Sequence, residues 1–138
     1  MSNSSGGANT GEHAKTILML EDDPDLATTL KEFFLNEGFA VTHAVNGVDG
    51  LKRIMAGDFN LILCDMLMPH LAGDMFYAAV ERVKPNLCKR FIFMTGHQGD
   101  PKWDAFVRRV GGIMLFKPFE LHVLIEAIQS VLKKTNQV

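Results

Sequence analysis

The chain has 138 residues, 47% of them apolar, which suits one ordinary domain with a single core. Its 14 lysines and arginines stand against 16 aspartates and glutamates, so the net charge of −2 offers no basic surplus for binding nucleic acid or an anionic membrane. Apolar runs of about four residues are far shorter than the roughly 20 that cross a bilayer, and we expect a cytoplasmic chain.

The two ends of the chain differ in composition from its middle. Residues 1–14 are rich in Ser, Gly and Asn and hold no apolar segment of the kind found in signal peptides. We therefore expect a flexible leader over residues 1–14, one domain over residues 15–134 and a short tail over residues 135–138. Cys64 and Cys88 are too few and too scattered for a disulfide framework or a zinc site.

The first half of the predicted domain alternates between strand and helix patterns. Thr16–Leu20 is an apolar run with the length of a β-strand. Apolar residues in Leu26–Phe34 then recur at helical spacing, and Gly38 ends that predicted helix. Ala40–Ala44 is a second, less apolar strand that we place at the edge of a sheet. Helical spacing returns in Val48–Met55.

The second half continues the same alternation. Leu61–Cys64 is apolar on both faces, which indicates a central strand. Pro85 ends the helix that follows it, and a polar loop separates the fourth strand from the fourth helix. The remaining strands are Phe91–Met94 and Ile113–Phe116, and the remaining helical patterns are Phe76–Val83, Trp103–Val110 and Leu121–Leu132.

Strict alternation of strands and helices predicts an α/β fold with a parallel sheet and helices on both of its faces. Right-handed crossovers leave few topologies for five strands. We expect the doubly wound, flavodoxin-like (βα)5 sandwich of three layers, with its parallel sheet in the order 2-1-3-4-5. The switch point of this topology lies between the first and third strands, where open α/β sheets place their ligands.

Charged and hydroxyl side chains follow four of the predicted strands. Glu21 and Asp22 follow the first strand, Asp65 the third, Thr95 the fourth and Lys117 the fifth. The carboxyl ends of parallel strands meet at one edge of a sheet, so these five side chains converge. Two carboxylates about 5 Å apart repel by roughly 3 kcal/mol at an effective dielectric of 20, so three need compensation. Mg²⁺ supplies it, because it prefers oxygen ligands and binds carboxylates together with phosphate oxygens.

Each of these residues also has a purely structural interpretation. Asp23-Pro24 reads as a helix start, with an N-cap followed by proline, although an N-cap does not require two further acids before it. Asp65 and Thr95 could organise turns, and Lys117 could be solvated. The convergence of all of them on one edge favours a site for a divalent metal and a phosphoryl group.

With these residues at the strand ends in this order along the chain, the sequence resembles a response-regulator receiver domain of two-component signalling. The resemblance extends over about Lys15 to Lys134. The resemblance rests on the acidic pair after the first strand, on Asp65 with Met68-Pro69 and Gly73 behind it, on Thr95-Gly96 and on Lys117-Pro118-Phe119. Each piece alone is weak, and together at these strand ends they are specific. The chain is then either a single-domain regulator or the receiver of a hybrid histidine kinase.

The resemblance implies a phosphorylatable switch rather than an enzyme, with at most self-phosphorylation and slow self-dephosphorylation. Asp65 would accept a phosphoryl group from a phosphohistidine of a histidine kinase or a histidine phosphotransfer domain. Glu21, Asp22, Asp65 and the backbone carbonyl of Leu67 would hold Mg²⁺, for which Mn²⁺ could substitute. Thr95 and Lys117 would bind the phosphoryl oxygens. The resemblance leaves room for a phosphorylation-dependent dimer, without binding to nucleic acid or membrane.

The resemblance also implies that the Lys117-Pro118 bond is cis, and a sharp turn there would aim Lys117 into the site. Three positions depart from the family pattern. Glu21 stands where an aspartate is more frequent, and Met114 stands where many receivers have an aromatic residue. Leu67, two residues after Asp65, cannot hydrogen-bond an attacking water. His97 lies two residues after Thr95 and could border the site.

Three alternatives to the switch differ in what they require. An aspartyl-phosphate phosphohydrolase of the haloacid-dehalogenase type needs a second aspartate two residues after the nucleophile, where this chain has Leu67. A flavin-binding module needs a Ser/Thr/Gly phosphate loop after the first strand, where this chain has three acids. A protein-interaction domain that is never phosphorylated stays open, although no key position is missing.

Overall fold

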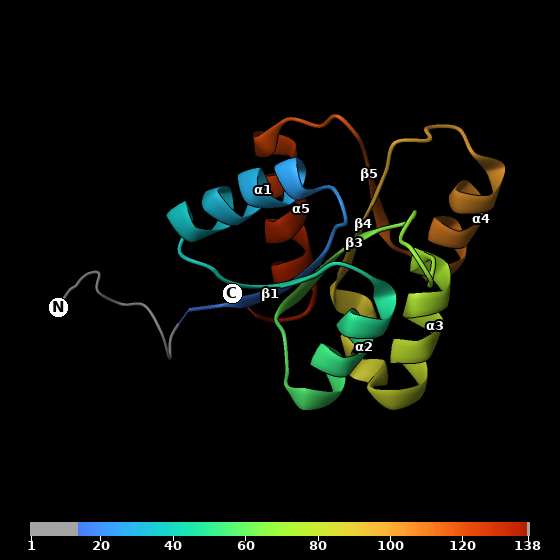
Figure 1. Ribbon diagram of the computed structural model, residues 1–138, viewed down its shortest axis with the longest axis horizontal. Helices are drawn as coiled ribbons and strands as arrows, with labels where there is room; N and C mark the ends of the chain where they lie inside the picture. The colour runs from blue at the N-terminus through green and yellow to red at the C-terminus, as the bar shows by residue number, and fades with distance from the viewer. Residues whose placement is uncertain (1–13, 138) are drawn as a thin grey trace, which may run out of the picture.

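The computed structural model describes residues 14–137, which form a parallel sheet between two layers of helices (Figure 1). The sheet order is β2-β1-β3-β4-β5. This confirms the expected fold class and strand order, with β2 at an edge and β3 in the centre. Nearly all of the expected leader, residues 1–13, lies outside the described residues. The strands are β1 (Thr16–Leu20), β2 (Ala40–Ala44), β3 (Leu61–Asp65), β4 (Phe91–Thr95) and β5 (Ile113–Phe116).

The helices begin soon after the strands, and several have polar caps. Asp23 caps α1 by accepting hydrogen bonds from the backbone N–H groups of Asp25 and Leu26, with Pro24 as the first helical residue. Asn46 caps α2 by accepting one hydrogen bond from the backbone N–H of Asp49 over 2.8 Å. The helices are α1 (Pro24–Asn36), α2 (Gly47–Ala56), α3 (Gly73–Val83), α4 (Pro101–Val110) and α5 (Leu121–Lys134). None of the helices among residues 14–137 has the length and apolar character needed to span a bilayer.

Each face of the sheet carries its own apolar core. The alternation of side chains along a strand sends Ile17 and Met19 to one face and Leu18 and Leu20 to the other. On the first face α1 and α5 cover the sheet, and α2, α3 and α4 cover the second (Figure 1). The helices contribute Ala27, Leu30, Phe34, Leu124, Ile128 and Val131 to the first core and Ile54, Phe76, Val80, Trp103 and Phe106 to the second.

Two features of the fold were absent from the sequence analysis. A short 3-10 helix, η2 (Pro85–Arg90), follows α3 and buries Leu87 completely. Gln137, beyond the end of α5, exchanges two hydrogen bonds with Asn60 at the start of β3. The Asn60 amide donates to Gln137 Oε1 over 2.7 Å, and the Gln137 amide donates to the Asn60 carbonyl over 3.0 Å. These bonds tie residues after α5 to the amino end of the sheet.

Candidate functional site

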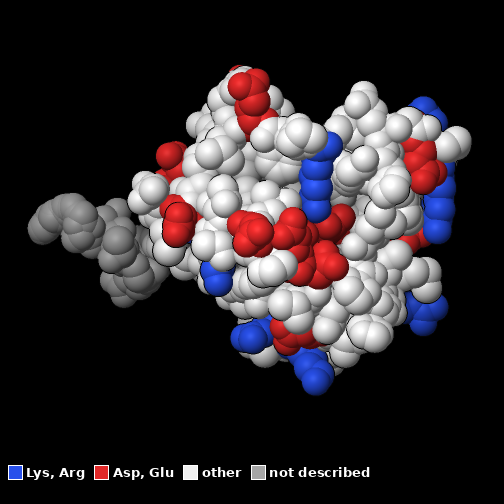
Figure 2. Space-filling model, turned by 45° about the horizontal axis from the view of Figure 1, so that its top comes forward, with Lys and Arg blue, Asp and Glu red and all other residues white. Residues whose placement is uncertain are grey.

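Three carboxylates meet at the carboxyl ends of β1 and β3. One oxygen from each of Glu21, Asp22 and Asp65 lies within 4.8 Å of the other two. Glu21 is fully buried and Asp65 is 5% exposed, whereas Asp22 is exposed. Figure 2 shows acidic side chains gathered in the centre of one face, with a basic side chain beside them. The expected convergence of these acids is therefore present in the fold.

Lys117 reaches this cluster from the end of β5. Its Nζ donates to Glu21 Oε1 over 2.8 Å and to Asp65 Oδ2 over 2.6 Å. Burial alone would lower the pKa of Lys117, but its hydrogen bonds to Asp65 and Glu21 and their negative charges outweigh burial and raise it. The ammonium therefore stays protonated. One ammonium against three carboxylates leaves two negative charges uncompensated within the cluster.

Three further partners hold Glu21 besides Lys117. Its Oε2 accepts a hydrogen bond from the backbone N–H of Asp23 over 3.0 Å. Its backbone carbonyl accepts one from Nε2 of His43 over 2.7 Å, and its backbone N–H donates to the Ala44 carbonyl over 3.2 Å. Burial raises the pKa of Glu21, although the bonds from Lys117 and from the Asp23 N–H act against that rise. The Glu21 side chain is thus buried and fixed by hydrogen bonds, unlike an acid that is free on the surface.

Asp65 ends the central strand and begins a tight turn. Its Oδ1 accepts a hydrogen bond from the backbone N–H of Leu67 over 3.1 Å. The Gly73 N–H donates to the Met66 carbonyl over 3.0 Å, which brings the start of α3 against the turn. A Cβ at Gly73 would lie 2.9 Å from Met66 Cα, so only glycine fits there. The glycine behind Asp65 therefore shapes the loop that carries Leu67.

Thr95 and Lys117 are neighbours across β4 and β5. The Lys117 N–H donates to the Thr95 carbonyl over 2.7 Å. Thr95 is fully buried, and its Oγ1 accepts a hydrogen bond from the His97 N–H over 3.1 Å, which leaves the hydroxyl proton free for an acceptor. The Lys117-Pro118 bond is cis, as predicted.

Sequence reasoning did not single out His43 or the backbone N–H groups of Asp23 and Leu67. The pairing of His43 with Met19 follows from the strand register, but the reach of its ring to the Glu21 carbonyl depends on a side-chain rotamer. The backbone donors depend on loop geometry that spacing does not specify. Of these groups, only His43 could have been predicted, because the second strand pairs with the first and brings this residue beside it.

The sequence profile of the response regulator receiver domain matches residues 17–129. The response regulator receiver protein CpdR of Brucella abortus (strain 2308) is 31% identical over 121 residues, which cover 86% of this chain and 97% of that protein. The transcriptional regulatory protein GlrR of Escherichia coli (strain K12) is 28% identical over 121 residues, 86% of this chain. These residues are only 26% of GlrR, so the chain spans about a quarter of that relative.

Two solved structures have the same fold. The CheY-like receiver domain protein of Methanospirillum hungatei JF-1 superposes with a TM-score of 0.82 at 26% identity, covering 90% of this chain and 98% of that one. The receiver domain of a histidine kinase from Syntrophus aciditrophicus gives a TM-score of 0.78 at 25% identity, covering 91% and 95%. The matched profile, the relatives and the two solved structures all point to the same family as the strand order and the residues at the strand ends. The chain belongs to the family of response regulator receiver domains.

Proposed function

We propose that Asp65 accepts a phosphoryl group from a phosphohistidine of a histidine kinase or a histidine phosphotransfer domain. Receiver domains are phosphorylation-based signalling switches that accept phosphoryl groups rather than act as enzymes, and they interact with histidine kinases. The observation that carries the assignment is the position of Asp65. It is a nearly buried carboxylate with Lys117 on one oxygen, the Leu67 N–H on the other and two further acids within 4.8 Å.

In the proposed step an Asp65 oxygen forms a bond to phosphorus while the phosphorus–nitrogen bond of the donor breaks. The electron pair of that bond returns to the imidazole, and the product is an acyl phosphate. Lys117 already bonds Asp65 Oδ2, so its ammonium is placed to stabilise the charge on the transferring oxygens. The free hydroxyl proton of Thr95 gives a second donor for a phosphoryl oxygen.

The carboxylate cluster fits Mg²⁺. Three oxygen donors within 4.8 Å of one another, with two negative charges that Lys117 does not compensate, are the ligands that a small hard cation prefers. The same donors accept Mn²⁺. When bound, Mg²⁺ would supply positive charge that offsets the charge of the carboxylates and of the phosphoryl oxygens. We still expect the backbone carbonyl of Leu67 to be a further ligand of Mg²⁺.

A small phosphodonor tests the assignment without the cognate kinase. Acetyl phosphate with Mg²⁺ should add one phosphoryl group to the intact mass, and EDTA should suppress the addition. Asp65→Asn should abolish it, because the amide is no longer a nucleophile. Asp104→Asn, which removes an exposed acid of α4 outside the cluster, is the matched control and should label normally. Labelling of Asp65→Asn at the wild-type rate would overturn the proposal.

Several finer expectations stay predictions. These are the cytoplasmic location, the phosphorylation-dependent dimer, and the lack of binding to nucleic acid and membranes. The transcriptional activity named for GlrR belongs to a protein of which this chain covers 26%, and we do not propose it for this chain.

A further inference from the structure

His43 of β2 lies beside the first of the acids, although the phosphorylation chemistry proposed above does not use it. The parallel register pairs it with Met19 of β1, two residues before Glu21. Because side chains alternate along a strand, His43 lies on the same face of the sheet as Val41, which packs against the core under α1 and α5. The residue is half-buried, and its ring contacts the Glu21 carbonyl just past the paired part of β1.

The Glu21 carbonyl is a buried acceptor at the point where strand pairing stops. Glu21 has no exposed surface, and the pairing of β1 with β2 ends at Leu20 and Ala44. Among residues 14–137, the His43 ring is the only group that hydrogen-bonds this carbonyl, with Nε2 2.7 Å from the oxygen. A carbonyl can only accept, so the ring presents its Nε2–H there. Without His43 this buried oxygen would have no partner, which destabilises a fold.

The bond is important because of the peptide unit that it holds. The carbonyl belongs to the peptide that links Glu21 to Asp22, the two acids after β1 that meet Asp65. The Glu21 N–H is fixed as well, by its bond to the Ala44 carbonyl over 3.2 Å. Both polar groups of the Glu21 backbone are therefore bonded to β2, and this sets the directions in which the two acidic side chains leave the chain.

Asp22 depends on this backbone more than Glu21 does. The Glu21 carboxylate has partners of its own, the Lys117 ammonium and the Asp23 N–H. The Asp22 side chain is exposed, and it takes part in none of the hydrogen bonds or salt bridges within the described part of the chain, residues 14–137. Its place within 4.8 Å of the other two carboxylates therefore follows from the course of the backbone.

We propose that His43 is a positioning residue of the metal site. By holding the Glu21–Asp22 peptide, its ring keeps Asp22 where it can share a cation with Glu21 and Asp65. This inference rests on the proposed function, since it takes the carboxylate cluster to be the Mg²⁺ site. Loss of a group that hydrogen-bonds behind a metal ligand typically costs about 10–100-fold in metal affinity. His43 holds the backbone of its ligands rather than their side chains, so we expect about tenfold, the lower end of that range.

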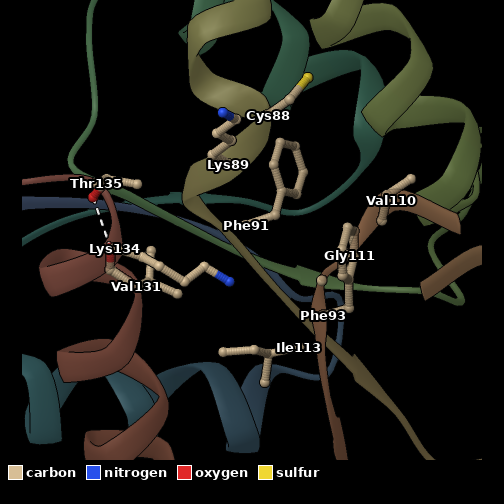
Figure 3. A pocket seen from close by; sticks show the side chains of 11 residues that line it. Cys88, Lys89, Phe91, Phe93, Val110, Gly111, Ile113, Val131, Lys134 and Thr135 are labelled. Atoms are coloured by element: carbon tan, nitrogen blue, oxygen red, sulfur yellow. Dashed lines mark hydrogen bonds between the residues drawn. The ribbon is translucent and has the colours of Figure 1, made fainter. Parts of the chain in front are cut away.

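A titration with Mg²⁺ locates the metal site and measures its affinity. The unphosphorylated full chain is isotope-labelled, and the dissociation constant is taken from NMR chemical-shift changes. The shifts should centre on residues 20–23, 43–46 and 64–67, at the carboxyl ends of the strands. The internal reference is a cavity of about 270 Å³ at the amino ends of β4 and β5, lined by residues that include Phe91 and Ile113 (Figure 3). Their signals should not move, because this cavity lies at the opposite edge of the sheet.

Three variants separate positioning from stability. His43→Leu removes the donor and should weaken Mg²⁺ binding about tenfold. His43→Gln can present an amide N–H to the same carbonyl and should bind within about threefold of wild type. His122→Leu, the same substitution at an exposed histidine of α5, should bind as wild type does. Melting temperatures in EDTA check that each variant is folded, and His43→Val, too short to reach the carbonyl, replaces the leucine variant if that one is not.

The role of His43 and the metal site fail in different ways. Wild-type Mg²⁺ affinity in folded His43→Leu, even with a lower melting temperature in EDTA, would overturn the positioning role and leave the metal site in place. Equal weakening in His43→Leu and His43→Gln would overturn that role too. Mg²⁺ affinity that Asp22→Asn leaves unchanged, or shifts centred on the cavity in Figure 3, would overturn the metal site itself and the role of His43 with it.

Discussion

Lys117 holds two carboxylates that would otherwise lie unpaired inside the protein, and its removal tests how the cluster is stabilised. The Lys117 side chain is 21% exposed, whereas that of Glu21 is 0% and that of Asp65 is 7% exposed. Lys117→Met keeps much of the apolar stem but removes both charge-assisted hydrogen bonds. Glu21 then keeps only the Asp23 N–H on its carboxylate. We expect a large loss of stability at neutral pH.

The expected loss has a physical ceiling. Breaking a buried ion pair from one side costs about 3–5 kcal/mol. Glu21 can escape that cost by taking a proton, and protonating a glutamate of ordinary pKa at pH 7 costs about 3.7 kcal/mol. We therefore expect Lys117→Met to lower the free energy of unfolding by about 3 kcal/mol at pH 7, or the melting temperature by about 10 °C.

The pH dependence has a defined sign. Burial already raises the pKa of Glu21, and removing Lys117 removes a group that lowers it, so the folded variant binds a proton more tightly than the unfolded chain. Destabilisation from such a group is greatest above its folded pKa and fades as pH falls toward its unfolded pKa. Protonating Glu21 at pH 5 costs only about 1 kcal/mol, so the difference from wild type should shrink to about that size.

Urea unfolding in EDTA at pH 7 and pH 5 measures both quantities. Lys133→Met, the same change at an exposed position, should stay within about 0.5 kcal/mol of wild type. Adding Glu21→Gln to Lys117→Met should restore part of the stability, because the buried charge is gone. A loss that is equally large at both pH values, or no loss at all, would refute the reasoning.

Three further substitutions test other parts of the site. Asp22→Asn should raise the melting temperature in EDTA and weaken Mg²⁺ binding, since like charges no more than 4.8 Å apart repel by at least about 1 kcal/mol, even in a water-like dielectric. Gly73→Ala should destabilise by about 1–3 kcal/mol in thermal unfolding, because its Cβ would meet the Met66 backbone. Leu67→Asn should speed the decay of the acyl phosphate, measured by intact mass over time, because an amide can orient water and the 46% exposed leucine cannot.

Each of these results has a clear opposite. A lower melting temperature of Asp22→Asn in EDTA, with Mg²⁺ affinity unchanged, would place that acid outside the cluster. Gly57→Ala is the matched control for Gly73, since nothing lies within 4 Å of its Cβ, and an equal loss in both variants would exclude the contact as the cause. Equal or slower decay in Leu67→Asn would show that Leu67 does not determine the lifetime of the acyl phosphate. Recruitment of water by His97, two residues after Thr95, would then be the alternative to test.

The residues that meet at the carboxyl ends of the strands could be predicted, because one physical rule decides where those ends lie. Apolar runs end where the sheet ends, and parallel strands share that edge, so Asp65 and Lys117 could be brought together from sequence although 52 positions separate them. The order of the strands followed from the right-handed crossover and from the apolar character of β3. The cis bond at Lys117-Pro118 came from the family resemblance alone.

The remaining features depend on side-chain reach and loop conformation, which periodicity does not encode. The His43 ring reaches the Glu21 carbonyl from β2, a contact that depends on its side-chain rotamer. Glu21 is buried and has four hydrogen-bond partners, whereas its neighbour Asp22 is exposed. The acidic run alone could not separate the two. The 3-10 helix η2 is too short to show a helical period.

The most direct test of the central claim is to locate the acyl phosphate on the chain. The protein is phosphorylated with acetyl phosphate and Mg²⁺, the acyl phosphate is reduced with borohydride, and the digest is sequenced by tandem mass spectrometry. Phosphorylation of Asp65 predicts that the reduced side chain appears at that residue alone and is absent without the phosphodonor. Reduction at Glu21, Asp22 or another acid, with Asp65 unchanged, would contradict the account.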